Sequence, residues 1–468
     1  MKTIRLGYSI EGTAKDGRRI FLPWFQNKVE HPFDEFTPAS FREWKNQNFQ
    51  GIDSTGDFDH FNVIGLGRYG TNFEADLYQN YIQKDQSFYI PITWSYRAYG
   101  FQEAFTIKFS KQRLPEDLLN YIRTTHRAQV LFYSFWEGFI EEHSLEFIET
   151  FCKGNGLTKR DVLVVSSNLN PNLRSWNKPY RLYQISHFSQ DLWFFNKSKA
   201  EGFEESKQLF EKYYRENNEL PKEKRFLCLN RRWDNHRNFI AGYIQSQPQI
   251  RKDTWLSLGV GSKGICKRDG TFGMPTGFDV LDNVDVFRNS KHYEEVADFW
   301  RSVGKDSPNV ILDTDPSDPA ILENKVDLND QLYRTAFVNL LTETHFFSRN
   351  IQFLSEKTFK SIYCLQPFIL VSTAGTLEQL RRLGFRTFSN WWDESYDEIE
   401  EESPRLDKII ELVNSIAALP KKALIEMTQD MNSILLTNAY TLMSSADIDA
   451  LLDYLKFEQE SRTKPVLI

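Results

Sequence analysis

The sequence lacks the long apolar runs that mark membrane-spanning helices and secretory leaders. Nowhere do about 18 apolar residues follow one another without interruption, which is roughly the length that a transmembrane helix needs. The first residues, MKTIRLGYSIEGTAKDGRR, contain no apolar segment of the kind found in a signal peptide. We therefore expect no transmembrane segment and a cytoplasmic location.

Cysteine is also scarce, and its spacing argues against two further classes of protein. The four cysteines form no Cys-x-x-Cys pair, so neither a zinc site nor a disulfide framework is indicated. Three of them lie in apolar runs, and we expect reduced, buried thiols. The four are Cys152, Cys228, Cys266 and Cys364.

The chain has no large excess of charge of either sign. With 57 Lys and Arg against 64 Asp and Glu, its net charge is −7, which gives no general attraction to a polyanion. What the sequence does have is a globular composition, with 40% hydrophobic and 15% aromatic residues. Its 468 residues exceed what one hydrophobic core normally holds, so we expect two large domains.

Apolar runs alternate with amphipathic stretches from residue 114 onward, whereas residues 1–110 are aromatic-rich and show no clear period. In the first half, apolar runs at 128–135 and 161–166 flank a helical stretch at 144–152. Continuous apolar strands separated by helices are typical of a parallel sheet that is covered on both faces.

The polar stretch 215–222 is the best candidate for a boundary between domains. We predict an α/β protein with an N-terminal α/β domain at 1–218, a C-terminal Rossmann-like domain at 219–440 and a helical tail at 441–468. In the C-terminal domain we expect strands at 225–229, 254–260, 337–342, 367–372 and 386–389, and helices at 235–245, 356–364, 377–383 and 406–419.

Polar and basic residues follow the first strand of the C-terminal domain. Asn230, Arg231 and Arg232 come directly after it, and a helix then begins near Asn235. In a doubly wound sheet ligands bind beyond the carboxyl ends of the strands, where these side chains would lie. A guanidinium group suits phosphate oxygens, and the helix N-terminus adds backbone donors. The alternative is a solvated basic turn, above all for Arg237.

A second polar pattern follows the strand at 337–342. Glu343 stands at the carboxyl end of this strand, and Ser355 is a natural N-cap for a helix that begins with Glu356 and Lys357. A carboxylate there can accept both ribose hydroxyls of a nucleotide while the neighbouring lysine reaches the diphosphate. Ordinary capping of the helix by Glu356 is the alternative.

These residues carry a family resemblance. The segments TET at 342–344, LSEKTFK at 354–360 and QPFI at 366–369 resemble the donor-site signature of fucosyltransferase-like glycosyltransferases of the GT-B fold. The segment 383–397 is similar to the end of phage-borne glycosyltransferase-like proteins. This chain has TET where the fucosyltransferases have Glu-Asn, and a long insertion at 261–330, so fucose is not carried over as the donor sugar.

The resemblance implies a fold, an activity and a set of roles. The fold would be two Rossmann-like domains facing across a cleft, and the activity would be sugar transfer from a nucleotide-sugar donor to a hydroxyl. No metal and no cofactor besides the donor would be needed. Glu356 would bind the donor ribose, Lys357 and an arginine of the 230–232 turn the diphosphate, and Glu343 would shape the same pocket. The acceptor stays open between a glycan, a lipid-linked sugar, a protein and a modified nucleobase.

A catalytic base is expected from the N-terminal domain. Glu137 follows the apolar run 131–135 beside a glycine, where a carboxylate of raised pKa could deprotonate the acceptor hydroxyl. His187 is the other candidate for this role, and an ordinary loop acid is the alternative interpretation of Glu137. Whether transfer inverts or retains the anomeric configuration is left open.

Three other interpretations compete with this one. Residues 65–70 match the G-x-G-x-x-G dinucleotide fingerprint, although the next apolar run ends in Trp94 rather than in an acid. Asp313 and Asp315 form an Asp-x-Asp pair that would suit a metal-dependent transferase of the GT-A type. The third is a non-catalytic carbohydrate-binding protein on a GT-B scaffold.

Overall fold

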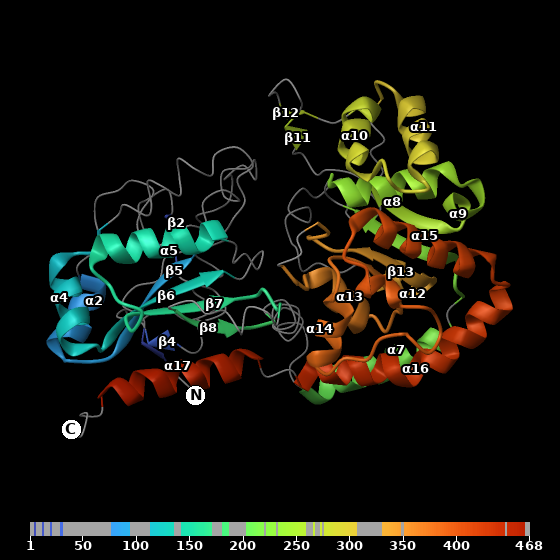
Figure 1. Ribbon diagram of the computed structural model, residues 1–468. Helices are drawn as coiled ribbons and strands as arrows, with labels where there is room; N and C mark the ends of the chain where they lie inside the picture. The colour runs from blue at the N-terminus through green and yellow to red at the C-terminus, as the bar shows by residue number, and fades with distance from the viewer. Residues whose placement is uncertain are drawn as a thin grey trace. The chain divides into compact units, whose positions relative to one another are not determined.

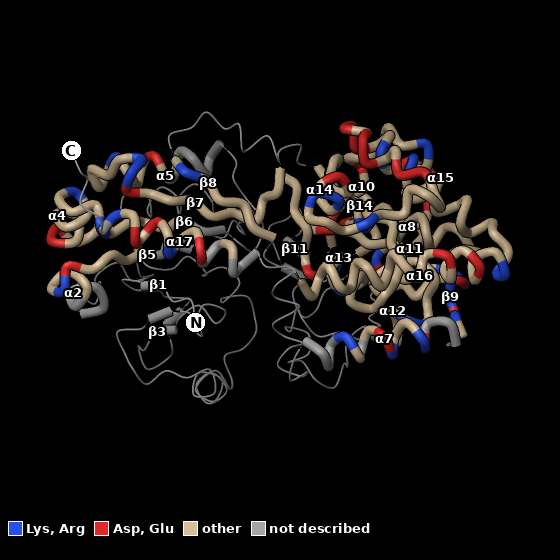
Figure 2. Tube along the Cα trace, turned by 90° about the horizontal axis from the view of Figure 1, so that it is seen from below, with Lys and Arg blue, Asp and Glu red and all other residues tan. Residues whose placement is uncertain are grey.

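The chain forms two compact units, Met1–His187 together with Ala446–Ile468, and Phe188–Ser445 (Figure 1). The computed structural model describes residues 4–5, 12–13, 19–20, 29–30, 76–93, 113–134, 142–170, 180–186, 203–219, 221–230, 233–258, 265–266, 272–273, 276–306, 330–347, 351–444 and 447–463. Within these ranges no helix combines the length and the apolar character that crossing a bilayer requires. Figure 2 shows acidic and basic residues interspersed along the described parts of both units.

This division differs from the boundaries expected at 218/219 and 440/441. Helix α7 (Phe203–Glu219) belongs to the second unit, where it packs against α16 (Lys421–Ser444). Helix α17 (Asp447–Thr463) belongs to the first unit. The polar stretch at 215–222 includes the end of α7 and lies within the second unit, so it does not separate the two units.

The first unit is built on a four-stranded parallel sheet in the order β5-β6-β7-β8. Two short pairs accompany it, β1 parallel to β4 and β2 antiparallel to β3. Besides α17, the described elements are β1 (Ile4–Arg5), β2 (Gly12–Thr13), β3 (Arg19–Ile20), β4 (Val29–Glu30), α2 (Asp76–Gln83), β5 (Phe88–Thr93), α4 (Glu116–Thr125), β6 (Ala128–Ser134), α5 (Glu142–Asn155), β7 (Val162–Ser166) and β8 (Arg181–Gln184).

Both faces of this sheet are covered. Phe88 and Phe132 belong to a buried cluster with α2, α4 and α5, and the ring of Phe132 meets that of Phe151 edge-on at 5.5 Å. Because strand side chains alternate, Tyr89 faces the other side, where its hydroxyl donates to the Leu455 carbonyl of α17 at 2.9 Å. Figure 1 shows α5 above the sheet and α17 below it. A segment from the far end of the chain thus completes the first unit.

The second unit contains a four-stranded parallel sheet in the order β10-β9-β13-β14. The described elements besides α7 and α16 are β9 (Lys224–Asn230), α8 (Asn235–Ser246), α9 (Pro248–Lys252), β10 (Thr254–Leu258), β11 (Ile265–Cys266), β12 (Phe272–Gly273), α10 (Gly277–Val284), η2 (Asp285–Phe287), α11 (Tyr293–Val303), α12 (Asp330–Thr335), β13 (Ala336–Thr342), α13 (Glu356–Tyr363), β14 (Phe368–Val371), α14 (Thr376–Arg382), η3 (Ser395–Glu398) and α15 (Glu402–Ala418).

This strand order creates a topological switch point between β9 and β13. The chain leaves β9 towards β10 on one side and later returns to add β13 and β14 on the other. The two strands are in register through Val338 with Phe226, which brings their carboxyl ends at Asn230 and Thr342 together. Open α/β sheets bind ligands at such a point. The two parallel sheets with their helices confirm the predicted fold class, an α/β protein with two Rossmann-like domains.

A close contact fixes the helices on one side of this sheet. Trp300 of α11 is fully buried, and its indole Nε1 donates to the Asn238 carbonyl of α8 at 3.3 Å. A Cβ atom at Gly242 would lie 2.4 Å from Trp300 Nε1, and one at Gly277 would lie 2.4 Å from the Trp300 carbonyl oxygen. Glycine at these two positions therefore lets α8 and α10 approach Trp300.

The strand expected at 386–389 is not formed, and this prediction was wrong. The backbone N–H and C=O of Arg386 bond to the side-chain amide of Asn438 in α16, at 2.7 and 2.8 Å. A side chain 52 residues away thus satisfies the groups that a sheet ladder would have used. The fingerprint at residues 65–70 lies outside the described residues.

Candidate functional site

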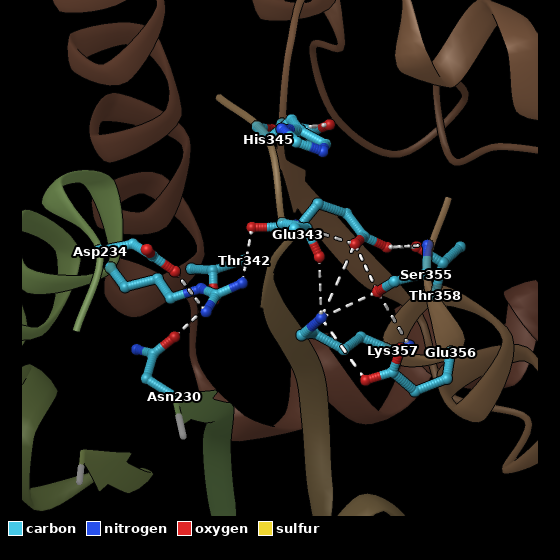
Figure 3. A network of polar contacts seen from close by, with 12 residues as sticks. Asn230, Asp234, Thr342, Glu343, His345, Ser355, Glu356, Lys357 and Thr358 are labelled. Carbon is cyan, nitrogen blue, oxygen red and sulfur yellow. Dashed lines mark hydrogen bonds and ion pairs between the residues drawn. The ribbon is translucent and has the colours of Figure 1, made fainter. Parts of the chain in front are cut away.

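The candidate site lies at the carboxyl ends of β9 and β13, where a network of polar contacts joins the two strands to α8 and α13 (Figure 3). The first link is between the strands themselves. The Thr342 hydroxyl donates to the Asn230 side-chain oxygen, and the Asn230 amide donates to the Cys228 sulfur at 3.4 Å. Asn230 is 1% exposed, so its contacts are with the sheet.

Glu343 follows Thr342 and points its carboxylate at the start of α13. Oε1 accepts from the Ser355 backbone N–H at 3.1 Å and from the Thr358 hydroxyl at 2.6 Å. Oε2 accepts from the Ser355 hydroxyl at 2.5 Å and from the Thr344 N–H at 3.1 Å. The side chain is fully buried, and the positive end of the α13 dipole favours its negative charge. Glu343 is therefore anchored within the protein.

Ser355 is the N-cap of α13, as the sequence predicts. Its backbone is extended, and its hydroxyl accepts from the Lys357 backbone N–H at 3.4 Å while donating to Glu343. The buried Ser355 hydroxyl also accepts from Lys357 Nζ at 2.9 Å. A single side chain thus caps the helix and orients the lysine ammonium group.

Glu356 and Lys357 are the more exposed members of the network. The Lys357 side chain is 27% exposed and that of Glu356 17% exposed, whereas that of Glu343 is completely buried. Lys357 Nζ lies 3.6 Å from Glu356 Oε1 and 4.0 Å from Glu343 Oε2, and it donates to the Thr344 hydroxyl at 3.4 Å. One lysine between two carboxylates leaves this group of three with a formal charge of −1.

Helix α8, which follows β9, contacts Glu343 through two side chains of its first turn. His236 Nε2 lies 2.9 Å from the Glu343 carbonyl oxygen, and Arg237 Nη2 donates to that oxygen at 3.0 Å. Burial, reinforced by the neighbouring Arg237 charge, lowers the pKa of His236 to about 3, so the ring is neutral and its Nε2 carries the proton that the carbonyl accepts. Arg237 is also paired with Asp234.

These two residues correct the sequence analysis. Arg237 is 3% exposed, so it is not part of a solvated basic turn. His236 was missed altogether. Their position in the sequence could have indicated both residues, because they lie in the first turn of a helix that follows the carboxyl end of a strand.

The other predicted residues divide by where they fall. Of the donor-site residues, Asn230, Glu343, Ser355, Glu356 and Lys357 come together in this network. Several further candidates lie outside the described residues, namely Arg231, Arg232, Glu137, His187, Asp313 and Asp315. Among the residues that the structure does describe, no three His, Cys, Asp or Glu side chains are grouped to hold a metal ion.

A second buried carboxylate stands one strand further along. Asp397 accepts from the backbone N–H groups of Leu377 and Glu378, at 3.1 and 3.2 Å, and so caps α14 after β14. Burial raises the pKa of Asp397. In the segment 383–397, Trp391 donates to Asp430 of α16 and Trp392 is buried, so both tryptophans contact the protein.

Comparison with known proteins was made at the levels of sequence and fold. No family model and no curated protein sequence matches the chain. The N-terminal domain of trehalose-6-phosphate phosphatase from Candida albicans aligns over 77% of this chain and 77% of its own, with a TM-score of 0.35 and 13% identity. A UDP-forming α,α-trehalose-phosphate synthase from Burkholderia xenovorans aligns over 84% of this chain and 81% of its own, with a TM-score of 0.38 and 8% identity. Likenesses of this degree carry no argument about residues or activity.

Proposed function

We propose that this protein is a glycosyltransferase that binds a nucleotide-sugar donor at the first turn of α13 and transfers the sugar to a hydroxyl group. The proposal is carried by one observation, the placement of Glu356 and Lys357 at the N-terminus of the helix that follows β13, beside the switch point of a parallel sheet. Ligands of open α/β sheets bind at such points, and helix N-termini favour phosphate.

The roles follow from chemistry and exposure. The Glu356 carboxylate would accept the ribose hydroxyls, and Lys357 would bind a diphosphate oxygen after turning away from Glu356, which lies 3.6 Å from it. Because Lys357 and the two nearby glutamates sum to −1, these three groups alone do not attract an anion. Arg231 and Arg232 would therefore supply the remaining positive charge.

In the proposed transfer the acceptor hydroxyl oxygen bonds to the anomeric carbon. The bond from that carbon to the diphosphate oxygen breaks, and the nucleoside diphosphate leaves with the electron pair. The hydroxyl proton passes to a general base, for which Glu137 is proposed and His187 is the alternative. Fixed cationic groups on the diphosphate would stabilise the charge that develops on the leaving group. The acceptor would be a glycan, a lipid-linked sugar, a protein or a modified nucleobase.

The test is thermal stabilisation by UDP, GDP, ADP and CDP, each measured in EDTA and in Mn²⁺. A diphosphate at about one hundred times its Kd stabilises the native state by about 2.7 kcal/mol. For a unit of this size such a gain raises the melting temperature by roughly 5–10 °C. We expect this shift without metal, and we expect Lys357→Ala to lose it.

Lys422→Ala is the matched control, because the Lys422 side chain is 88% exposed and lies on another helix. Equal shifts in Lys357→Ala and in wild type would refute the donor site. A shift that needs Mn²⁺ would favour a metal site such as Asp313 and Asp315. A non-catalytic carbohydrate-binding protein would be favoured if a sugar nucleotide binds but no acceptor causes release of the nucleoside diphosphate.

A further inference from the structure

Glu343 is bonded to two helices at once, through two different groups. Its carbonyl oxygen accepts from His236 and Arg237 in the first turn of α8. Its carboxylate accepts from Ser355 and Thr358 at the start of α13. Both helices follow strands of the switch point, so one residue connects the two strand ends from which the proposed donor site is built.

The Glu343 carboxylate has no acceptor position left for a ligand. Each of its two oxygens already accepts one hydroxyl and one backbone N–H, and the side chain is completely buried. A buried carboxylate with its acceptor positions filled stabilises the groups that donate to it. Glu343 is thus suited to holding other residues in place and not to contacting the diphosphate.

The donors on the α8 side are themselves held in place. The His236 ring stacks on Phe346, with centroids 5.2 Å apart and planes 9° apart. The Arg405 guanidinium lies 4.4 Å from the same Phe346 ring and donates to the Phe346 carbonyl. The turn after β13 is therefore bound through the carbonyls of Glu343 and Phe346 by side chains from α8 and α15.

We propose that His236 and Arg237 are positioning residues for Lys357, and that they act through Glu343. The line of contacts runs from the first turn of α8 to the Glu343 carbonyl, then from its carboxylate to the Ser355 hydroxyl, and from there to Lys357 Nζ at 2.9 Å. The inference deepens the proposed donor site and rests on it for its meaning in function. The coupling itself exists without any ligand and can be tested in its absence.

Two substitutions at His236 separate hydrogen bonding from packing. His236→Phe keeps a ring against Phe346 but removes the donor, whereas His236→Gln keeps an N–H donor and removes the ring. Tyr243→Phe is the matched control, because it removes a hydrogen bond from the same helix to Asn414, away from Glu343. Two quantities are measured in ligand-free protein, namely hydrogen exchange of the amides of 355–358 and acetylation of Lys357 by acetic anhydride.

We expect His236→Phe to speed both exchange and acetylation by about tenfold, the ratio that corresponds to loss of one buried hydrogen bond of ordinary strength. The exchange and acetylation rates of His236→Gln should stay closer to those of wild type, and the rates of Tyr243→Phe should equal those of wild type. The reverse order, with Gln worse than Phe, would show that His236 only packs, and wild-type values in His236→Phe would overturn the coupling.

If His236→Phe fails to fold, Thr358→Val provides the same test from the α13 side, because it removes one donor to Glu343. Coupling between two sites is reciprocal, so this variant should also speed exchange in the first turn of α8, and unchanged exchange there would overturn the proposal. The two hypotheses fail differently. No stabilisation by UDP, GDP, ADP or CDP rejects the donor site alone, whereas wild-type exchange in the variants rejects the coupling alone.

Discussion

Replacing Glu343 by Gln is the most direct perturbation of the network, because it keeps the shape of the side chain and removes only its charge and one acceptor. Each carboxylate oxygen accepts one hydroxyl and one backbone N–H. If Oε1 becomes NH2, the Thr358 hydroxyl can rotate to accept from it, whereas at Oε2 the Ser355 hydroxyl already accepts from the Lys357 backbone N–H and Nζ. In either case a backbone N–H is left facing another donor. The loss is therefore at least one buried hydrogen bond to a charged group.

The magnitude follows from this geometry. A hydrogen bond to a charged group contributes about 1.5–3 kcal/mol, and an unsatisfied buried donor adds its own desolvation cost. The ion pair with Lys357 contributes less, because its atoms are 4.0 Å apart and the lysine is partly exposed. We expect Glu343→Gln to lower the free energy of unfolding of the second unit by roughly 2–4 kcal/mol.

Native-state hydrogen exchange of the β13 amides measures this loss without requiring the whole chain to unfold in one transition. Asp397→Asn is the comparison, because Asp397 also caps a helix of this sheet from a buried position but lies one strand away. Acetylation of Lys357 should rise in Glu343→Gln and remain unchanged in Asp397→Asn. A loss below about 1 kcal/mol would refute the reasoning, since a neutral side chain would then serve as well as the carboxylate. A rise of Lys357 reactivity in both variants would also refute it, since the effect would then not be specific to Glu343.

Two further predictions concern the packing of α8 and the pH dependence of stability. Gly242→Ala should gain about 1 kcal/mol of helix propensity but lose more, because its Cβ would lie 2.4 Å from Trp300 Nε1 and overpacking costs roughly 1–3 kcal/mol. A lower melting temperature that Trp300→Phe partly restores in the double variant would confirm the clash, and an unchanged or higher one would exclude it. Since burial raises the pKa of Asp397, the folded state binds its proton more tightly than the unfolded chain. The contribution of Asp397 to the free energy of unfolding is therefore greatest at a pH below its unfolded pKa and falls as the pH rises through its folded pKa. Asp397→Asn should flatten that part of the curve of unfolding free energy against pH. An unaltered curve would exclude this assignment.

The start of α13 could be predicted from the sequence because the information is local. Ser355 caps the helix through the backbone N–H two residues later, which is a relation that a short motif contains. The role of Glu343 could not be predicted in this way. Apart from the adjacent Thr344 N–H, its carboxylate partners lie 12 and 15 residues away, and its carbonyl partners lie 106 and 107 residues away. Those contacts depend on β9 and β13 being neighbours, and no periodicity in the sequence shows the order of strands in a sheet.

The motif at 355–358, which we propose binds the donor, therefore contains two kinds of residue that the sequence alone does not separate. Ser355 and Thr358 are three residues apart, lie on the same face of α13 and are both buried against Glu343. Glu356 and Lys357 occupy the positions between them and keep part of their side chains exposed. The helical period thus divides the motif into an inner half that binds the protein and an outer half to which the proposed ligand contacts belong. A resemblance that rests equally on all four positions therefore counts two helix-anchoring residues as if they recognised a ligand. Only Glu356 and Lys357 bear directly on the ligand that we propose.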